Sequence, residues 1–260
     1  MLLALAASML LFPQPQHRTL SVFAAASLKE AFTSIAKDYE AAHRGSKVRL
    51  NFAGSQTLAA QINHGAPADV FASAAARNLA QVAYDRSSCR VFARNRLAIG
   101  LRKGLRGVSS FKDLAQVRNI VVADPAVPVG GHTATFLTKA AKEHGAGWLR
   151  SVRSHVVSQE ADVKAVLAKV RLGEADAGIV YISDVRSARG AVDMLPIPDR
   201  LNVLAQYPVA IPASSTNRDE ALRFIRFLLG PGSQSRLRKA GLLSPDRRAS
   251  LKPASLQCKS

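Results

Sequence analysis

The residues best suited to chemistry in this 260-residue chain lie in two turns, each of which joins a strand-like segment to a helix-like one. Three alanines precede Ser27 in the first turn, and Gly54 precedes Ser55 in the second. Gly54 permits a tight turn, and each serine offers a hydroxyl and a backbone N–H where a helix begins. Free N–H groups and the positive end of the dipole make a helix start favourable for anions. The two turns predict a small anion site of N–H and O–H donors, with no Lys or Arg in the pocket.

A simpler structural role also fits these turns. Ser27 and Glu30 have the spacing of a capping box, in which the serine side chain stabilises the helix start by about 1 kcal/mol. A Gly-Ser turn before a helix is common as well. The binding interpretation is favoured because the two turns follow neighbouring strands of one predicted sheet.

The motifs of common enzyme classes are missing from the sequence. It contains no Gly-x-Ser-x-Gly elbow, no His-Glu-x-x-His, no phosphate loop and no dinucleotide fingerprint after the first strand. Isolated histidines in polar segments are usually surface residues. We therefore predict a binding protein rather than an enzyme, with no metal ligated by side chains. The isolated histidines are His17, His43, His64, His132, His144 and His155.

The segments that must position the two serines follow a β-α-β-α-β order. Apolar runs predict buried strands over 20–24, 48–52 and 70–72, and apolar residues at helical intervals predict helices over 28–42 and from 58 to 62. This order implies a parallel sheet flanked by helices. Both serine turns then lie at the carboxyl edge of the sheet, where ligands of open α/β folds bind.

The same rhythm restarts in the second half of the chain. The sequence therefore predicts an α/β fold of two lobes, each a mainly parallel sheet flanked by helices. The predicted lobes are residues 18–98 with 206–246, and residues 99–205. The further strands are expected over 96–101, 120–123, 177–181 and 204–210, and the further helices over 133–143, 162–172 and 219–229.

The net charge of +18 raises the question of a nucleic-acid partner. The basic residues are scattered, only 6% of the residues are aromatic, and the densest stretch, 231–260, has seven Lys or Arg against one Asp. Nucleic-acid-binding proteins usually gather such residues on one face. We predict no nucleic-acid partner and a solvated positive surface that attracts anions at long range. An anion-sensing regulatory domain with a basic, nucleic-acid-contacting surface is the alternative from a different class.

The two ends of the chain and its cysteines allow limited conclusions. Residues 1–17 contain the apolar run Met1–Phe12, which is too short to span a bilayer and resembles the core of a secretion signal. A buried first strand or helix is the alternative. Residues 247–260 are expected to form a basic tail. Cys89 and Cys258 fit no metal spacing, and whether they pair is left open.

A specific resemblance appears once the serine turns are read together with the segments around them. In this order, and over about residues 20 to 243, the chain resembles the molybdate-binding proteins of ABC importers. The segments that carry the resemblance are Val22–Leu28, Phe52–Ala59, Gly65–Phe71, Val91–Leu97, Ala123–Gly130 and Gly178–Tyr181.

The resemblance implies a two-lobed periplasmic-binding-protein fold of type II. It also implies a monomer outside the cytoplasmic membrane that needs no cofactor, holds molybdate or tungstate between its lobes and delivers it to a membrane permease. It assigns the oxyanion to the hydroxyls and N–H groups of Ser27 and Ser55, the N–H groups of Val129 and Val163, and the hydroxyl of Tyr181. From the residues alone, Val163 also fits a core helix position, Val129 a loop, and Tyr181 a strand end with its hydroxyl at the surface or on a buried partner.

The chain departs from this family pattern in one place near the expected cleft. Gly130, Gly131 and His132 stand where the family commonly has bulkier residues, so a looser edge of the cleft is expected there. Sulfate, phosphate or a small carboxylate is the alternative ligand within the same class of binding protein.

Overall fold

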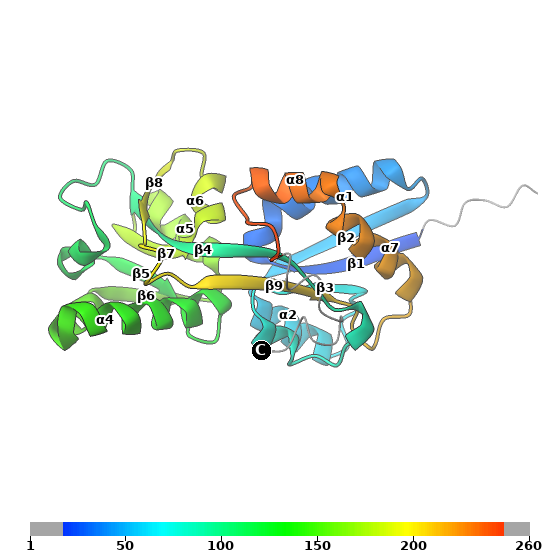
Figure 1. The fold of residues 1–260 in the computed structure, drawn as a ribbon, viewed down its shortest axis with the longest axis horizontal. Helices are drawn as coiled ribbons and strands as arrows, with labels where there is room; N and C mark the ends of the chain where they lie inside the picture. Colours follow the sequence, from blue (N-terminus) through cyan, green and yellow to red (C-terminus); the bar gives the residue numbers. More distant parts are fainter. Residues whose placement is uncertain (1–17, 247–260) are drawn as a thin grey trace, which may run out of the picture.

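The computed structural model describes residues 18–246, and its strands form a nine-stranded sheet system in the order β2-β1-β3-β9-β4-β7-β5-β6, with β8 also paired to β4. Figure 1 shows two α/β halves side by side, joined by strands β4 and β9, which run through both. The strands are β1 (Arg18–Ala25), β2 (Ser46–Ala53), β3 (Val70–Ala72), β4 (Arg90–Arg102), β5 (Ile120–Ala123), β6 (Val156–Glu160), β7 (Ala177–Tyr181), β8 (Val192–Pro196) and β9 (Leu204–Ala210).

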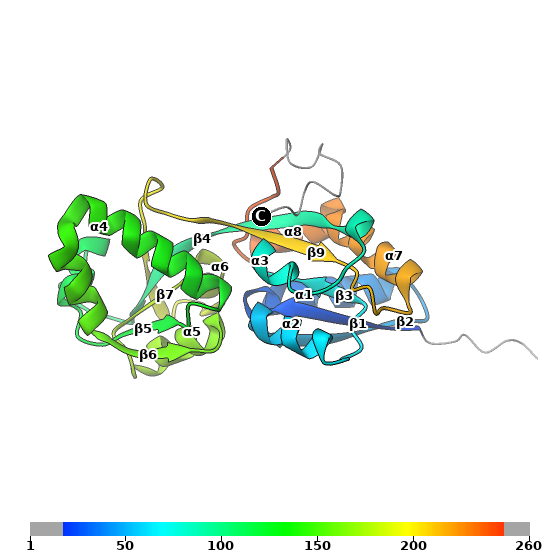
Figure 2. The ribbon, with the colours of Figure 1, turned by 90° about the horizontal axis from the view of Figure 1, so that it is seen from below.

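Helices cover both faces of the sheet in each half (Figures 1 and 2). The α-helices are α1 (Lys29–Ala42), α2 (Ser55–Asn63), α3 (Ala76–Leu79), α4 (Pro128–Ser154), α5 (Val163–Leu172), α6 (Ile182–Ser187), α7 (Arg218–Leu229) and α8 (Pro231–Lys239). The short 3-10 helices are η1 (Ala26–Leu28), η2 (Arg86–Ser88) and η3 (Phe111–Gln116).

Successive side chains of β1 pack into apolar layers on opposite faces of the sheet in the first half. Strands β1, β2 and β3 are parallel, and successive side chains of a strand point to opposite faces. Val22 packs into the cluster that includes α1 and α7, whereas Phe23 packs into the cluster beneath α2 and α3. Both residues are buried, so each face of this sheet has its own apolar layer.

The second half repeats the arrangement around β5. Strands β6 and β7 pair with β5 in parallel, and the later part of β4 pairs antiparallel with both β7 and β8. Phe136 of α4 and Val166 of α5 are fully buried against this sheet. The parallel strands therefore end at the edge that faces the first half, which places their following helix starts at the boundary between the halves.

The last part of the chain lies on the half that holds the first strand. Strand β9 pairs antiparallel with β3, and Phe224 of α7 stacks edge-on against Tyr39 of α1. The predicted lobe bounds at residues 98 and 205 fall at strands that belong to both halves. The division into 18–98 with 206–246, and 99–205, stays a prediction.

Several elements differ from the sequence-based expectation. The helix expected over 133–143 begins five residues earlier, at Pro128, and reaches Ser154 through a non-helical Gly145 with φ 86°. Strands β6 and β8 and helices α3, α6 and α8 were not predicted. Their short length or mixed polarity hides the periodicity on which such a prediction depends.

Among residues 18–246, no helix is long and apolar enough to cross a membrane. The predicted leader, residues 1–17, and the predicted basic tail, residues 247–260, lie outside the described residues. Cys89 is buried and is not a free thiol, while Cys258 lies in the tail, so the pairing of these two cysteines stays open.

Candidate functional site

A small cavity lies where helix starts from both halves meet. The volume open to the centre of a water-sized sphere is about 20 Å³, which suits a small ion and excludes a sugar, peptide or nucleotide. We call it the cleft cavity. It is lined by Ala25, Ala26, Ser27, Gly54, Ser55, Ala74, Val127, Pro128, Val129, Asp162, Val163 and Tyr181.

All five predicted ligand residues line this cavity. Ser27 and Ser55 come from the first half, and Val129, Val163 and Tyr181 come from the second. Each of the five residues is at least nine-tenths buried. The structure thus brings together residues that are up to 154 positions apart in the chain (27 to 181). Their role as ligands stays a prediction.

Backbone N–H groups at three helix starts belong to the cavity wall. The helical hydrogen bonds of α2, α4 and α5 begin at the N–H groups of Leu58, Gly131 and Val166. The amides of Ser55, Val129 and Val163 precede these positions, so they have no partner inside their own helices. Asp162 caps α5 by accepting hydrogen bonds from the next two amides, Lys164 and Ala165, and leaves the Val163 N–H outside that cap.

Gly130 explains how α4 can begin so close to the end of β5. A Cβ at this position would lie 2.0 Å from the carbonyl oxygen of Asp124 and 2.6 Å from that of Ala123. Only glycine permits this approach, which places Val129 in the cavity wall.

The hydroxyl of Ser27 belongs to a buried polar chain rather than to a helix cap. Its Oγ lies 2.9 Å from Tyr207 Oη, and Asn95 Nδ2 donates to Tyr207 Oη at 3.3 Å and to Ser183 Oγ at 2.8 Å. The capping-box prediction is wrong: Ser27 lies inside η1, α1 is capped by Leu28 without a side-chain bond, and Glu30 turns to Lys164. The extra 3-10 turn moves the helix start past Ser27.

Ser55 is held from within the first half. It is the first residue of α2, and its Oγ accepts a hydrogen bond of 3.0 Å from the N–H of Ala74. The side chain is 1% exposed, so its hydroxyl has no competing bulk water. One lone pair of Ser55 is thereby occupied by the protein, and the hydroxyl hydrogen remains for a ligand.

Tyr181 has a partner that the sequence did not indicate. Its Oη lies 2.9 Å from Nδ1 of His132, in the first turns of α4. Burial raises the pKa of Tyr181 well above its ordinary value, so the hydroxyl keeps its hydrogen at neutral pH. Burial, and then the nearby charge of Arg77, lower the pKa of His132 to about 4. His132 is thus only partly exposed, and the general expectation of surface histidines missed its contact with a strand end 49 residues away.

Arg77 occupies the edge of the cleft that was expected to be loose. Its Nη2 donates to the carbonyl oxygens of Pro125 at 2.8 Å and Val127 at 3.0 Å. A Cβ at Gly131 would lie 2.5 Å from Nη2, so the missing side chain of Gly131 makes room for the guanidinium. The small residues after Pro128 therefore give a filled edge rather than an open one.

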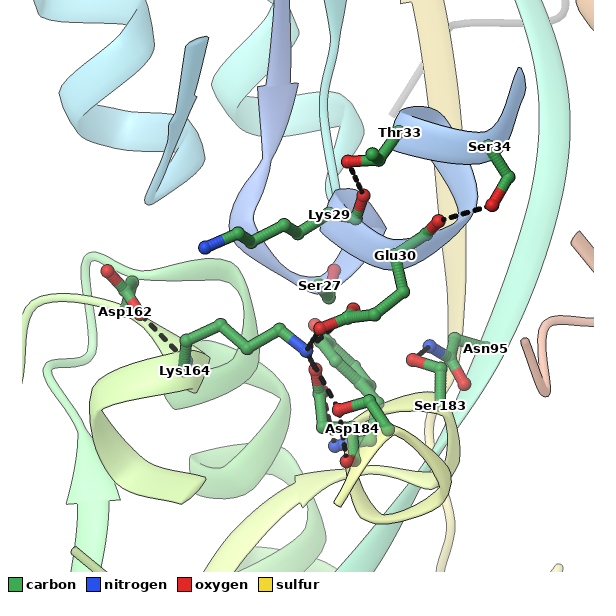
Figure 3. Close-up of polar contacts among 12 residues, drawn as sticks. Ser27, Lys29, Glu30, Thr33, Ser34, Asn95, Asp162, Lys164, Ser183 and Asp184 are labelled. Atoms are coloured by element: carbon green, nitrogen blue, oxygen red, sulfur yellow. Dashed lines mark hydrogen bonds and ion pairs between the residues drawn. The ribbon is translucent and has the colours of Figure 1, made fainter. Parts of the chain in front are cut away.

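Two further polar contacts join the halves beside the cavity. Gln56 Nε2 donates to the carbonyl oxygen of Ala161 at 2.9 Å, and Lys164 Nζ of α5 lies 2.8 Å from Glu30 of α1. Figure 3 shows Lys164 reaching from α5 across to Glu30, with Asp184 on its other side. Burial raises the pKa of Asp184 to about 6, although the Lys164 charge, 3.3 Å away, opposes this effect. These contacts hold the two halves together over the cavity, most of whose lining residues are buried.

A small cavity of N–H and O–H donors, lined mostly by buried residues of two α/β halves, defines a two-lobed binding protein for a small solute. A family model for bacterial extracellular solute-binding proteins matches residues 20–243. The chain belongs to this family, and its fold is the two-lobed type II fold of periplasmic binding proteins.

The chain is similar to curated molybdate-binding proteins. It is 34% identical to the molybdate-binding protein ModA of Mycobacterium tuberculosis over 238 residues, 90% of this chain and 87% of the relative. It is 30% identical to ModA of Escherichia coli, over 85% of this chain and 88% of the relative.

Solved structures share the fold. The periplasmic molybdate-binding protein of Azotobacter vinelandii matches with a TM-score of 0.77 and 21% identity, covering 87% of this chain and all of that one. The sulfate-binding protein SubI of Mycobacterium tuberculosis also matches with a TM-score of 0.77, at 17% identity over 89% of this chain and 88% of that one. At these identities the two structures support the fold alone.

Proposed function

We propose that this protein captures molybdate, and tungstate of the same charge and shape, outside the cytoplasmic membrane and delivers it to the permease of an ABC importer. The observation that carries the proposal is the convergence of Ser27, Ser55, Val129, Val163 and Tyr181 on one buried cavity of ion size. The names of the relatives that are at least 30% identical over most of their length support the choice of molybdate.

The donors of the cavity suit a dianion with four oxygens. Three hydroxyls and the free amides of helix starts supply hydrogen-bond donors from several directions, and the helix dipoles add positive potential without a fixed counter-charge. Hydrogen bonds to a charged ligand contribute about 1.5–3 kcal/mol each, so a few of them account for tight binding. We expect size to separate molybdate from sulfate, because both carry two charges and four oxygens.

Capture requires the halves to separate and close. The anion first meets one half, and rotation about β4 and β9 brings the donors of the other half against it. The polar contacts of Arg77, Gln56 and Lys164 across the boundary stabilise the closed arrangement that a permease would recognise.

We propose that the protein acts as a monomer. It has no catalytic role, no resident cofactor and no nucleic-acid partner in this proposal. In residues 18–246 no group of three or more His, Cys, Asp or Glu side chains is placed to hold a metal ion. Molybdenum would therefore be held only as its oxyanion, through hydrogen bonds.

A thermal-shift series with molybdate, tungstate, sulfate and phosphate tests the proposal, because a ligand that binds only the folded state raises the melting temperature. We expect the melting temperature to rise with molybdate and tungstate alone. At ligand concentrations of 100 to 1,000 times the Kd, the free energy of unfolding should increase by about 3–4 kcal/mol. An equal rise with all four anions, or a rise with sulfate alone, would reject molybdate as the ligand and keep the class of binding protein.

A further inference from the structure

The three hydroxyls of the cleft cavity share a feature that the ligand assignment does not explain. Each has a polar partner on the protein side: Ser55 accepts from the Ala74 N–H, Ser27 lies against Tyr207, and Tyr181 lies against His132. Each pair is 2.9 to 3.0 Å apart. The three partners come from three separate places, the segment after β3, strand β9 and helix α4, so the pattern is not a consequence of one local turn.

An oxyanion determines the direction in which these hydrogen bonds must run. A hydroxyl has one hydrogen to donate and lone pairs that accept, while an oxyanion only accepts. A hydroxyl that binds the anion must therefore accept, not donate, in its bond with the protein. Ser55 satisfies this condition, because the backbone N–H of Ala74 can only donate.

Asn95 favours the same direction at Ser27. The Oδ1 atom of Asn95 accepts from the Arg96 N–H, which leaves Nδ2 to donate to Tyr207 Oη. With that lone pair occupied, Tyr207 can donate its own hydrogen to Ser27 Oγ. Ser27 then directs its hydrogen into the cavity.

The direction of the bond at Tyr181 depends on His132. If Nδ1 of His132 is bare, Tyr181 donates to it and presents a lone pair to the anion, which is repulsive. If Nδ1 carries the hydrogen, Tyr181 accepts from His132, and its own hydrogen can then go to the anion or to the neighbouring hydroxyl of Tyr207. The neutral ring has one hydrogen to place on either nitrogen, so the position of this hydrogen decides whether Tyr181 helps or opposes binding.

We propose that His132 is a positioning residue for Tyr181: with its hydrogen on Nδ1, it donates to Tyr181 Oη and turns the tyrosine hydrogen toward the bound oxyanion. This inference rests on the proposed function. The depressed pKa of His132 supports it, because a neutral ring at pH 7 avoids a permanent charge beside the cavity. The groups that face the ring are Tyr181 and, from the first half, Arg77.

The experiment is a double-mutant cycle of molybdate affinity by isothermal titration at pH 7.5. His132→Phe keeps a ring but removes the donor, whereas His132→Asn can place its side-chain NH₂ near the position of Nδ1. We expect His132→Phe to weaken binding roughly tenfold, and His132→Asn to stay within about threefold of wild type. In a Tyr181→Phe background, His132→Phe should change affinity by less than about twofold, since the partner hydroxyl is already gone.

Melting temperatures of the ligand-free variants establish that each is folded, and His132→Leu replaces His132→Phe in the cycle if the latter does not fold. Equal losses for the Asn and Phe variants, or additive losses in the Tyr181→Phe background, would show that His132 only fills space and would overturn the inference. A wild-type protein that binds none of the four oxyanions overturns the proposed function instead, and the role of His132 with it.

Discussion

Two hollows lie side by side along the boundary between the halves, and they have opposite characters. The cleft cavity is lined mostly by buried residues, and no basic side chain is among them. About 20 Å³ of it is open to the centre of a water-sized sphere. The second hollow, which we call the basic groove, shares only Ser27 with it, offers about 470 Å³ and is exposed. The basic groove is lined by Ser27, Glu30, Arg171, Ser183, Arg186, Ser187, Ala188, Arg189, Lys239 and Ala240.

The difference separates two ways of attracting an anion. Exposed cations such as Arg171 and Arg186 raise the local concentration of anions, but water and salt screen each contact. Buried N–H and O–H donors act over hydrogen-bond distance in a site from which water is excluded, where each is worth more. We therefore expect the cleft cavity to determine affinity and selectivity, and the basic groove to influence only how fast the anion arrives.

The largest effect should come from removing a hydroxyl in the cleft cavity. Ser55→Ala and Ser27→Ala should each weaken molybdate binding by roughly 10- to 100-fold, the cost of a lost hydrogen bond to a charged group. Isothermal titration measures this loss. Ser214→Ala, an exposed serine of the first half, is the matched control and should bind like wild type. Wild-type affinity in both cavity variants would contradict the comparison.

The substitution Gly54→Ala should hinder closure of the two halves. A Cβ there would lie 2.7 Å from the carbonyl oxygen of Ala161 across the boundary, while the φ of −57° is ordinary for alanine. Gly54→Ala should therefore weaken molybdate binding about tenfold, mainly through faster release, with little loss of ligand-free stability.

Gly232→Ala is the control for Gly54→Ala, because a Cβ at Gly232 meets no atom within 4 Å. Small-angle X-ray scattering should show ligand-induced compaction in the control and a reduced change in Gly54→Ala. Full compaction with unchanged affinity would mean that the contact at Ala161 does not limit closure.

The burial of His132 beside the cleft cavity should affect how the free energy of unfolding depends on pH. The pKa of His132 is lowered from 6.5 to about 4, so below pH 6.5 the unfolded chain binds a proton that the folded chain does not. Stability contributed by the neutral ring is present above pH 6.5 and is lost as the pH falls toward 4. At pH 5.5 the loss relative to pH 7.5 should be about 1 kcal/mol.

Urea unfolding of wild type and His132→Asn from pH 7.5 to 5 measures this effect as a difference. Asp184, whose pKa is raised to about 6, acts with the opposite sign over part of this range, but it is present in both proteins and cancels. The wild type should lose stability faster than the variant as the pH falls. If the free energy of unfolding fell equally with pH in both proteins, the ring of His132 would be more exposed to solvent than the structure shows.

The smallest effect should come from the basic groove. Replacing Arg171 and Arg186 together by Gln should lower the association rate of molybdate by about two- to fivefold at low salt and leave the dissociation rate unchanged. Stopped-flow measurements should show the difference disappearing near 1 M salt, where the Debye length is about 3 Å. Arg118→Gln, an exposed change of charge just before β5, is the control. A changed dissociation rate would show that the groove contacts the bound anion.

The alternation of strands and helices could be predicted from the sequence because it depends on local periodicity. Strands β3, β5, β7 and β9 have the bounds expected from their apolar runs. Ser27 and Ser55 were found for a related reason, since the turn chemistry around them is local. Val129, Val163 and Tyr181 were found only through the family resemblance, because nothing in their own segments marks them as ligands.

The tertiary structure alone decided which partners these residues meet. The helix cap expected at Ser27 did not form, because a 3-10 turn moves the helix start past it, and its hydroxyl instead lies against Tyr207, 180 residues later. The contact of His132 could not be predicted either, because its neighbour Tyr181 ends a strand 49 residues away. Local sequence determines the elements and their turns, whereas burial and the direction of each hydrogen bond depend on which elements fold against one another.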